Sequence, residues 1–356
     1  MSRAKYTLKT IIAASIYFSG FNWLYTRINT KKRNIPIVFY HEIGNNVNDG
    51  LGEFSVTVDH FERQMQWLSR HFHVVSIDKL VEHIKGKIEL PGKLAAVTFD
   101  GGYVGNYQHA FPILKKYNVP ATIYITTSYI DGNISWERKL LFLISFTKEG
   151  HYVFLHNGQQ RCLELKTRRQ KLIAKQMIQN HMSKLNDEEK NNLLEQLSND
   201  LGVQPSGISR KLFLSWDQIR EMNQHPLVTI GSHSLTHPRL TNVSIEDVRK
   251  EIRGSKIQIE GKLGGGITSF CYPDGYYSEE IKKVVKNAGY SSALAVSTRG
   301  ILSDLNKFGD DVFELRRLYV PNRSFAPLLA VESSGLIRSI KKVGKSVLGY
   351  GTNGTI

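Results

Sequence analysis

The stretch LAAVTFDGGY (residues 94–103) begins as an apolar run, places Asp100 at its end and breaks at once into Gly101 and Gly102. A short apolar run that ends in glycines is typical of a strand buried on both faces, as in parallel sheets. In barrels of parallel strands, catalytic carboxylates stand at the carboxyl ends of the strands. The stretch therefore indicates a parallel sheet and a candidate catalytic Asp100, although an Asp that caps a turn beside glycines has the same pattern.

Six further apolar runs of similar length alternate with amphipathic segments. The runs are 35–41, 121–127, 227–233, 268–273, 292–298 and 314–320. Helical spacing of apolar residues appears in 57–70, 77–85, 109–117, 215–224, 244–263 and 278–288. Alternating strands and helices predict an α/β fold, and about seven parallel strands favour a closed or partly closed (β/α) barrel over an open sheet.

Residues 136–212 interrupt this alternation. They are rich in Lys, Gln, Asn and Leu, with helical periodicity from Leu165 to Leu201 and no convincing strand beyond 151–157. We expect a mainly helical insertion. It forms a lid or side wall over the site, or it is a surface decoration without function.

The composition, with 41% hydrophobic and 22% charged residues in 356, indicates a globular protein and excludes a disordered or fibrous one. The net charge of +15 gathers at the two ends: residues 1–34 carry seven Lys and Arg residues and no acid, and residues 331–356 carry four against one. A nucleic-acid partner is therefore not expected. We divide the chain into a basic segment 1–34, a catalytic domain 35–325 and a basic tail 326–356.

The N-terminal apolar run, residues 11–25, is shorter than the roughly 18–20 residues that a bilayer span requires. Ser15, Ser19 and Asn22 fall on one helical face, which favours a helix lying on an anionic membrane surface. A short or tilted span, an uncleaved signal and a helix docked on the protein are the alternatives. The expected location is membrane-associated, on a side that the residues do not indicate.

Cys162 and Cys271 are far apart and form no C-x-x-C motif, so neither a disulfide framework nor a thiolate zinc site is expected. The stretch GSHSLTHP (231–238) follows a predicted strand and places His233 and His237 four residues apart. At the start of a helical turn, two such imidazoles share a face and can bind one divalent cation. A pair of capping or surface histidines is the alternative.

Three segments in this order, TFDGGY (98–103), HSLTH (233–237) and FCYPDGY (270–276), resemble the motifs of the polysaccharide deacetylase family, the NodB-homology domain of carbohydrate esterase family four. The likeness extends over about residues 35–322. Similar stretches are PIVFYHEIG (36–44), YITTSYIDG (124–132), LSWDQIREM (214–222) and ALAVST (293–298). The resemblance implies hydrolysis of acetyl groups, in the first place N-acetyl groups, from a polysaccharide or a lipid-linked oligosaccharide.

By this resemblance, Asp100 is the general base that takes a proton from a metal-bound water, and His233 and His237 bind the divalent cation, usually zinc. The acetyl pocket is lined by a loop in which a backbone N–H next to the proline stabilises the oxyanion. The residues of this loop are Tyr272, Pro273, Asp274 and Gly275.

Gly101 departs from the family pattern, in which an aspartate at this position completes the metal triad. Asp100 turns to ligate the cation, a water or another side chain substitutes, or the chain is a catalytically silent carbohydrate-binding homologue that has lost its metal. We expect Gly101→Asp to raise zinc affinity, unless Gly101 has a positive φ or Asp100 already binds the metal.

The second departure from the family pattern concerns the general acid, which in the family is often a histidine from a C-terminal strand. No histidine follows His237 in this chain. His41, at the end of the first predicted strand, is the substitute that we expect, although a core histidine fits its position equally. Arg316 and Arg317 on the last predicted strand orient Asp100 or bind the sugar, or they serve packing alone.

Overall fold

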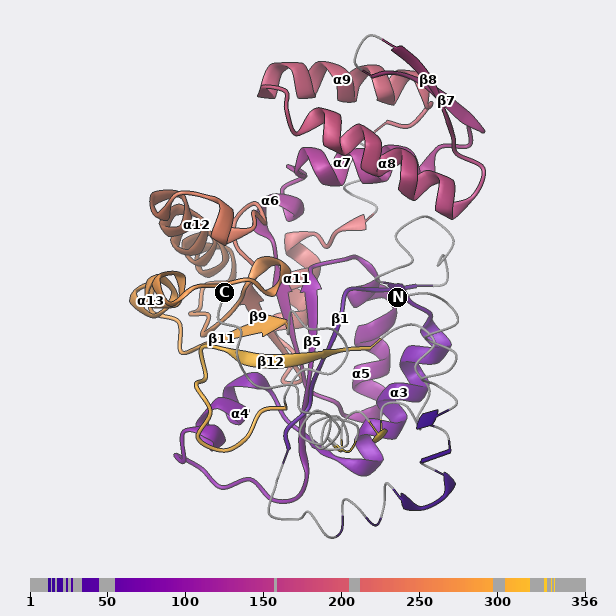
Figure 1. Ribbon diagram of the computed structural model, residues 1–356. Helices are drawn as coiled ribbons and strands as arrows, with labels where there is room; N and C mark the ends of the chain where they lie inside the picture. Colours follow the sequence, from indigo (N-terminus) through magenta and orange to yellow (C-terminus); the bar gives the residue numbers. More distant parts are fainter. Residues whose placement is uncertain are drawn as a thin grey trace, which may run out of the picture.

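The computed structural model describes residues 34–44, 55–156, 159–204, 212–296 and 305–320, with single residues between 12–27 and 330–336. Within these residues, seven parallel strands follow one another around a barrel that closes where β5 pairs with β1 (Figure 1). In spatial order they are β1 (Ile37–Tyr40), β12 (Leu315–Tyr319), β11 (Ser292–Val296), β10 (Ser269–Cys271), β9 (Val228–Ser232), β6 (Ala121–Ile125) and β5 (Leu94–Gly101). The seven strands and the closed barrel expected from the sequence are confirmed.

Strand β5 shows how the sequence pattern positions the site. All of its residues are buried, as expected for a strand with helices on one side and the barrel interior on the other. Thr98 and Asp100 face inward, where both reach Arg317 on the non-adjacent strand β12. Phe99 faces outward and packs on Phe61 of a surrounding helix. The alternation therefore places Asp100 inside the barrel at the end of the strand.

The helices that follow the strands lie close to the expected ranges. They are α3 (Val58–His71), α4 (Ile77–Ile84), α5 (Phe111–Tyr117), α11 (Trp216–Asn223), α12 (Ile245–Leu263) and α13 (Glu279–Asn287), with a π-helical turn η1 (Asn106–Ala110) before α5. Ser76, Ser215, Ser244 and Ser278 begin four of them, each accepting a backbone N–H of the first turn.

One end of the barrel is closed by α4. Leu80, Val81 and Ile84 of this helix belong to one buried cluster with Ile37 and Leu315 from the strands. Figure 1 shows α4 at the end opposite to the tips of β5 and β9. The other end, where the strands finish, remains for the site.

Three short strands lie outside the barrel. They are β2 (Glu42–Ile43), β3 (Ser55–Val56) and β4 (His73–Val74); β2 pairs with β3, and β4 extends the sheet beside β5. Short helical turns complete the described elements: α6 (Thr127–Ile130), η2 (Leu240–Asn242) and η3 (Pro273–Gly275).

Residues 136–204 form a separate unit beyond the end of the barrel (Figure 1). Its elements are α7 (Trp136–Phe146), β7 (His151–His156), β8 (Gln159–Glu164), α8 (Arg168–Met182) and α9 (Asp187–Asp200), packed around a core of their own. The expected helices are confirmed. The expectation of no strand beyond 151–157 is wrong, because β8 pairs antiparallel with β7. The QQRCLE sequence of β8 has little apolar signal, since its side chains are mostly exposed.

The described residues between Ile12 and Arg27 are mostly helical. In the part of the chain that the structure describes, no helix combines the length and the apolar character needed to cross a bilayer.

Candidate active site

The predicted site residues meet where the strands finish. Asp100 stands at the end of β5, His41 directly follows β1, and His233 directly follows β9. The loop 272–275 begins at the end of β10. Segments far apart in the sequence are therefore brought to one rim of the barrel, as the sequence predicted from its parallel strands.

Asp100 forms a bidentate ion pair with Arg317 inside the barrel. Nη1 of Arg317 lies 2.6 Å from Oδ1 of Asp100, and Nη2 lies 2.8 Å from Oδ2. Both side chains are almost completely buried. Burial by itself raises the pKa of Asp100, but the charge and hydrogen bonds of Arg317, together with the nearby His233 and His41, outweigh it, so the pKa lies well below its ordinary value. Asp100 is therefore ionised and held in one orientation.

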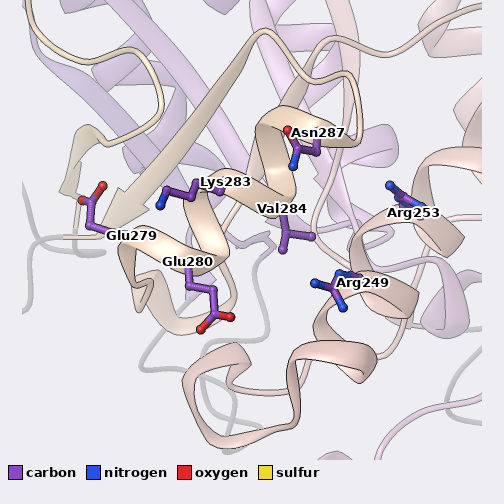
Figure 2. A pocket seen from close by; sticks show the side chains of 7 residues that line it. All are labelled: Arg249, Arg253, Glu279, Glu280, Lys283, Val284 and Asn287. Atoms are coloured by element: carbon purple, nitrogen blue, oxygen red, sulfur yellow. The ribbon is translucent and has the colours of Figure 1, made fainter.

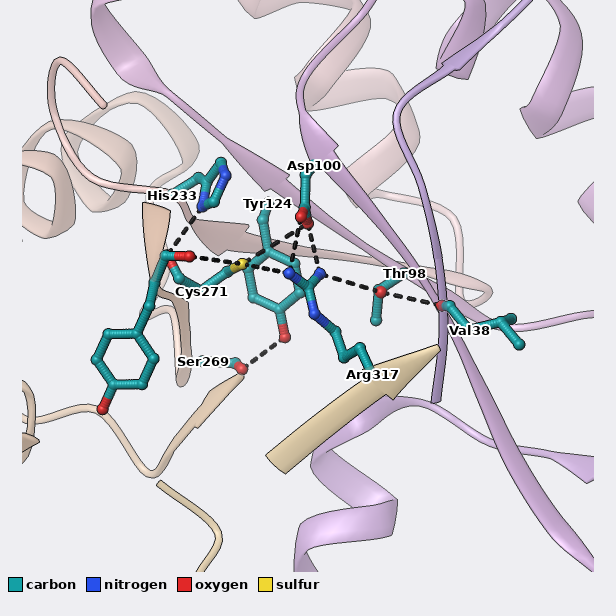
Figure 3. A network of polar contacts seen from close by, with 9 residues as sticks. Val38, Thr98, Asp100, Tyr124, His233, Ser269, Cys271 and Arg317 are labelled. Atoms are coloured by element: carbon teal, nitrogen blue, oxygen red, sulfur yellow. Dashed lines mark hydrogen bonds and ion pairs between the residues drawn. The ribbon is translucent and has the colours of Figure 1, made fainter. Parts of the chain in front are cut away.

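Below this pair, a chain of polar contacts crosses the barrel interior (Figure 3). Arg317 contacts Thr98, whose hydroxyl donates to the carbonyl of Val38 at 3.1 Å. Tyr124 and Ser269 share a hydrogen bond of 2.7 Å on the opposite side. A buried cation requires such partners, because an isolated charge in the barrel would lose its solvation without compensation. Arg316 points outward, toward Asp310.

His233 is oriented by a backbone carbonyl. Its Nδ1–H donates to the carbonyl oxygen of Cys271 at 2.8 Å (Figure 3). This leaves Nε2 with its lone pair. Burial lowers the pKa of His233, so the ring is neutral at neutral pH, which is the form that binds metal ions.

His237 lies beside His233, with 4.7 Å between the ring centres. Burial and the neighbouring His233 hold the pKa of His237 well below its ordinary value. The expected helical turn is wrong: no helix is present between β9 and η2, and both Ser234 and His237 have positive φ, at 67° and 66°. The turn is held by Glu251 of α12, which accepts the backbone N–H groups of residues 235 and 236.

Backbone strain concentrates here. Non-glycine residues with positive φ occur at four positions in the described chain: Asn118, Ser234, His237 and Asp274. Two of the four, His237 and Asp274, are predicted site residues, and Ser234 lies between His233 and His237. Such conformations cost free energy and persist where function requires a particular geometry.

His41 lies within electrostatic reach of Asp100 and His233. Burial lowers its pKa to about 4, which Asp100 opposes and the nearby arginines reinforce. The ring of His41 is therefore neutral at neutral pH. Its backbone carbonyl accepts a hydrogen bond from Asn106 at 2.7 Å, which fixes the end of β1.

The loop 272–275 contributes its backbone more than its side chains. The Tyr272 ring points away from the rim and donates to the carbonyl of Phe313. Gly275 has a φ of 77°, and a Cβ there would lie 2.5 Å from the backbone nitrogen of Val296. Asp274, with a φ of 55°, carries an exposed carboxylate 3.5 Å from Nε of Arg239.

Some of the donor atoms in the site are suited to binding a divalent cation, and others are already engaged. His233 and His237 supply two neutral imidazoles. Among the described residues, donor atoms of Asp100, His233 and Cys271 also lie within 4.8 Å of one another. However, Arg317 already contacts both oxygens of Asp100 and lies 3.0 Å from Sγ of Cys271, whose thiol has a pKa raised by burial. The imidazoles are therefore the available ligands.

Gly101 cannot accept a carboxylate without strain. Its φ is 91°, and a Cβ would lie 2.9 Å from the ring of Tyr103. We therefore expect Gly101→Asp to lower the free energy of unfolding by about 1–3 kcal/mol and to leave zinc affinity equal or weaker. Zinc titration calorimetry and urea unfolding measure both. Gly101→Ala is the control, because it adds a Cβ and the backbone strain without adding a negative charge. Tighter zinc binding by the Asp variant at unchanged stability would contradict this reading.

Two contributions to the site were not predicted from the sequence, although Cys271 lies in the FCYPDGY segment (270–276). Cys271 orients His233 through its carbonyl and contacts Arg317 through its sulfur. Arg138, from helix α7 of the insertion, lies within electrostatic reach of His41 and His237. A lone arginine on an amphipathic helix resembles any solvated surface residue, so only the fold identifies it.

A groove of about 570 Å³ lies away from this rim, between α12 and α13 (Figure 2). Its lining mixes both charges: Arg249, Arg253, Glu279, Glu280, Lys283, Val284 and Asn287. None of the predicted site residues lines it.

Comparison with known proteins relates this arrangement to a family. Residues 87–293 match the sequence pattern of the family described as Polysaccharide deacetylase. The Bacillus subtilis protein YxkH is 23% identical over 269 residues, covering 75% of this chain and 65% of YxkH. A poly-beta-1,6-N-acetyl-D-glucosamine N-deacetylase of Staphylococcus epidermidis is 35% identical over 81 residues, covering 22% of this chain and 28% of that protein. The chain matches less than two thirds of the length of either relative.

Solved structures share the fold at low identity. The Streptococcus pyogenes deacetylase PplD has a TM-score of 0.55 at 18% identity, covering 86% of this chain and 97% of that chain. IcaB from Ammonifex degensii has a TM-score of 0.53 at 18% identity, covering 85% and 97%. The family pattern spans more than half of the 356 residues and includes Asp100, His233 and His237. The chain therefore belongs to the polysaccharide deacetylase family.

Proposed function

We propose that this chain hydrolyses acetyl groups, specifically N-acetyl groups of hexosamine units, in a polysaccharide or a lipid-linked oligosaccharide. Family membership supports the reaction class, and the Staphylococcus epidermidis relative, named for an N-acetylglucosamine polymer, supports the substrate class. The observation that carries the proposal is the ionised Asp100, fixed by Arg317 beside two neutral histidines at the rim.

In this proposal Asp100 is the general base. It takes a proton from the water that attacks the acetyl carbonyl. Arg317 keeps the carboxylate ionised and holds both of its oxygens, so that a proton acceptor stands at a fixed place when substrate arrives. The hydrogen bonds beneath Arg317 hold the guanidinium in turn.

The proposed cofactor is a divalent cation, zinc, held by Nε2 of His233 and by the ring of His237. When bound, such a cation polarises the carbonyl and lowers the pKa of a bound water. The hydrogen bond from Nδ1–H of His233 to Cys271 supports this assignment, because metal-binding histidines commonly donate their other nitrogen to a carbonyl.

The oxyanion donor in this proposal is the backbone N–H of Asp274. The loop offers few choices, since Pro273 has no N–H. The N–H of Tyr272 donates to Leu294 at 3.0 Å, and that of Gly275 donates to Tyr272 at 2.9 Å. The positive φ of Asp274 turns its N–H away from the regular course of the strand.

We assign to His41 the role of general acid, which protonates the leaving amine. Because burial makes its ring neutral, His41 must gain a proton before it can donate one. Asp100, which takes a proton from water, is the nearby group that raises the pKa of His41. The proton therefore passes from the water to the amine by way of Asp100 and His41, and the amine leaves in a neutral form.

Release of acetate from β-1,6-linked N-acetylglucosamine oligomers, with and without a chelator, tests this function. A chromogenic acetyl ester tests the O-linked alternative in parallel. The silent homologue, favoured only by Gly101, predicts binding of the oligomer without release of acetate.

We also propose that residues 1–34 attach the chain to an anionic membrane surface or to its glycolipids. The described residues of this segment support the proposal. Phe18 and Phe21 are helical, and their exposed fractions are 75% and 52%. Ile12 and Leu24 are exposed as well. Exposed aromatic and aliphatic side chains next to Lys and Arg are typical of helices that lie at a membrane interface.

Deleting residues 1–34 should leave a folded barrel and weaken membrane binding by tenfold or more, since each Lys or Arg near an anionic surface contributes about 1 kcal/mol. Co-sedimentation with vesicles that contain an anionic phospholipid measures the change, and neutral vesicles are the control. If the shortened chain sediments as completely as the full chain, the attachment lies elsewhere, for example in residues 336–348.

A further inference from the structure

Helix α7 connects the insertion to the site. Leu140 and Leu143 of this helix pack into the core of the insertion. Phe142, on another face, belongs to a buried aromatic cluster with Tyr129 and Phe213 beside the rim. Figure 1 shows α7 between the barrel and the remainder of the insertion. The helix therefore presents one face to the insertion and another to the site.

Arg138 lies on the site-facing side. It precedes Phe142 by four residues, and residues four apart share a helix face. Its guanidinium carbon lies over the Tyr129 ring, 6.0 Å from the ring centre. The Tyr129 ring in turn stacks on His237, with 6.2 Å between the centres. These contacts link the guanidinium, through the Tyr129 ring, to His237 at the rim.

The charge of Arg138 acts on two histidines of the rim. Burial is the main cause that lowers the pKa values of His41 and His237, and the positive charge of Arg138 adds to the lowering at both rings. The two histidines follow different strands, β1 and β9, so the guanidinium is within electrostatic reach of both sides of the site.

Arg138 is half-buried and, within the described part of the chain, forms no ion pair with a carboxylate. Asp274 acts on it through space, and Asp100 is already held by Arg317. A guanidinium carries five N–H donors, and its strongest hydrogen bonds are those to carboxylate oxygens. The partly desolvated guanidinium of Arg138, which has no carboxylate partner among the described residues, therefore favours an anionic ligand.

We propose that Arg138 is a ligand-binding residue of the acetyl pocket, donating to the oxygens of acetate and to the acetyl oxygen as it gains negative charge during hydrolysis. The inference rests on the proposed function, of which acetate is the product. A neutral N-acetylhexosamine polymer offers no other anion at this place. The insertion thereby supplies a positive charge to a site whose own arginine, Arg317, is already paired with Asp100.

Binding of acetate and of acetamide, its neutral counterpart of equal shape, tests the proposal without turnover. Saturation-transfer NMR of the two methyl signals on the full chain, in chelator, gives both dissociation constants. The wild type should prefer acetate, and Arg138→Gln should weaken acetate binding about tenfold while leaving acetamide unchanged. Arg138→Lys should keep part of the preference, since it keeps the charge but loses the bidentate geometry.

Arg169→Gln is the matched control, because it removes an exposed arginine from the same insertion. Zinc affinity is a second readout: removal of a positive charge near His237 should leave zinc binding equal or tighter in Arg138→Gln. Equal acetate binding in wild type and Arg138→Gln, the same loss in Arg169→Gln, or weaker zinc binding would overturn the proposal. A wild type that prefers acetate but releases none from the oligomers would contradict the proposed function and leave Arg138 assigned.

Discussion

The Arg317→Met variant is expected to lose about 3–5 kcal/mol in its free energy of unfolding, because it leaves the buried Asp100 carboxylate without its partner. Urea unfolding at neutral pH measures this loss. Deacetylation should fall as well, since Asp100 would take up a proton instead of standing ionised. A loss below about 1 kcal/mol, the size of an exposed ion pair, would contradict the buried geometry.

Two controls separate charge from packing in the Arg317 experiment. In the Asp100→Asn/Arg317→Met double variant no charge remains buried, so part of the stability should return. The pH dependence has a definite sign, because the folded pKa of Asp100 lies below its ordinary value. The contribution of the pair is complete above the unfolded pKa of about 4 and is lost as the pH falls below it, so the difference between wild type and Arg317→Met should narrow in acid.

Replacing His233 or His237 by alanine should abolish metal retention and reduce acetate release by at least about a hundredfold, because one imidazole is too few to hold a catalytic cation that supplies several kcal/mol. Metal analysis of the purified variants and the oligomer assay measure the two effects. His151→Ala is the control, since it removes an exposed imidazole from β7. Unchanged metal content in both site variants would reject these ligands.

The barrel was predictable because each of its strands has a local sequence pattern of its own. A parallel strand with both faces buried is a short, dense apolar run, and β5 has no exposed residue. The hairpin partner β8 lacks that signal, since only Leu163 of its six residues is buried. Its pairing depends on β7 and on the insertion core, which no local pattern encodes.

The structure brings the predicted site residues to one rim, but not in the geometry that the sequence suggested. The spacing of His233 and His237 suggested one helical face, but the rings meet through a turn with two left-handed residues. That turn depends on Glu251, which lies on the next helix, so a local reading could not find it. The same holds for Arg317: the sequence offered Arg316 and Arg317 alike, and strand alternation in the closed barrel directs Arg317 inward.

The position of Arg138 near the site could not be predicted from the sequence, for another reason. Its importance comes from the position of α7 over the rim, which is fixed by the aromatic cluster around Phe142 and Phe213. Contacts between an insertion and its barrel depend on tertiary packing, and a single basic residue carries no pattern of its own.

Acetate release from β-1,6-linked N-acetylglucosamine oligomers by wild type and Asp100→Asn tests whether Asp100 serves a deacetylase site at this rim. Asp100→Asn keeps the size of the side chain and removes its ability to accept a proton as a carboxylate. We predict that the wild type releases acetate and that the folded Asp100→Asn variant releases at least about a hundredfold less. Equal rates for the two proteins, or no release by either, would show that Asp100 is not the base of a deacetylase site.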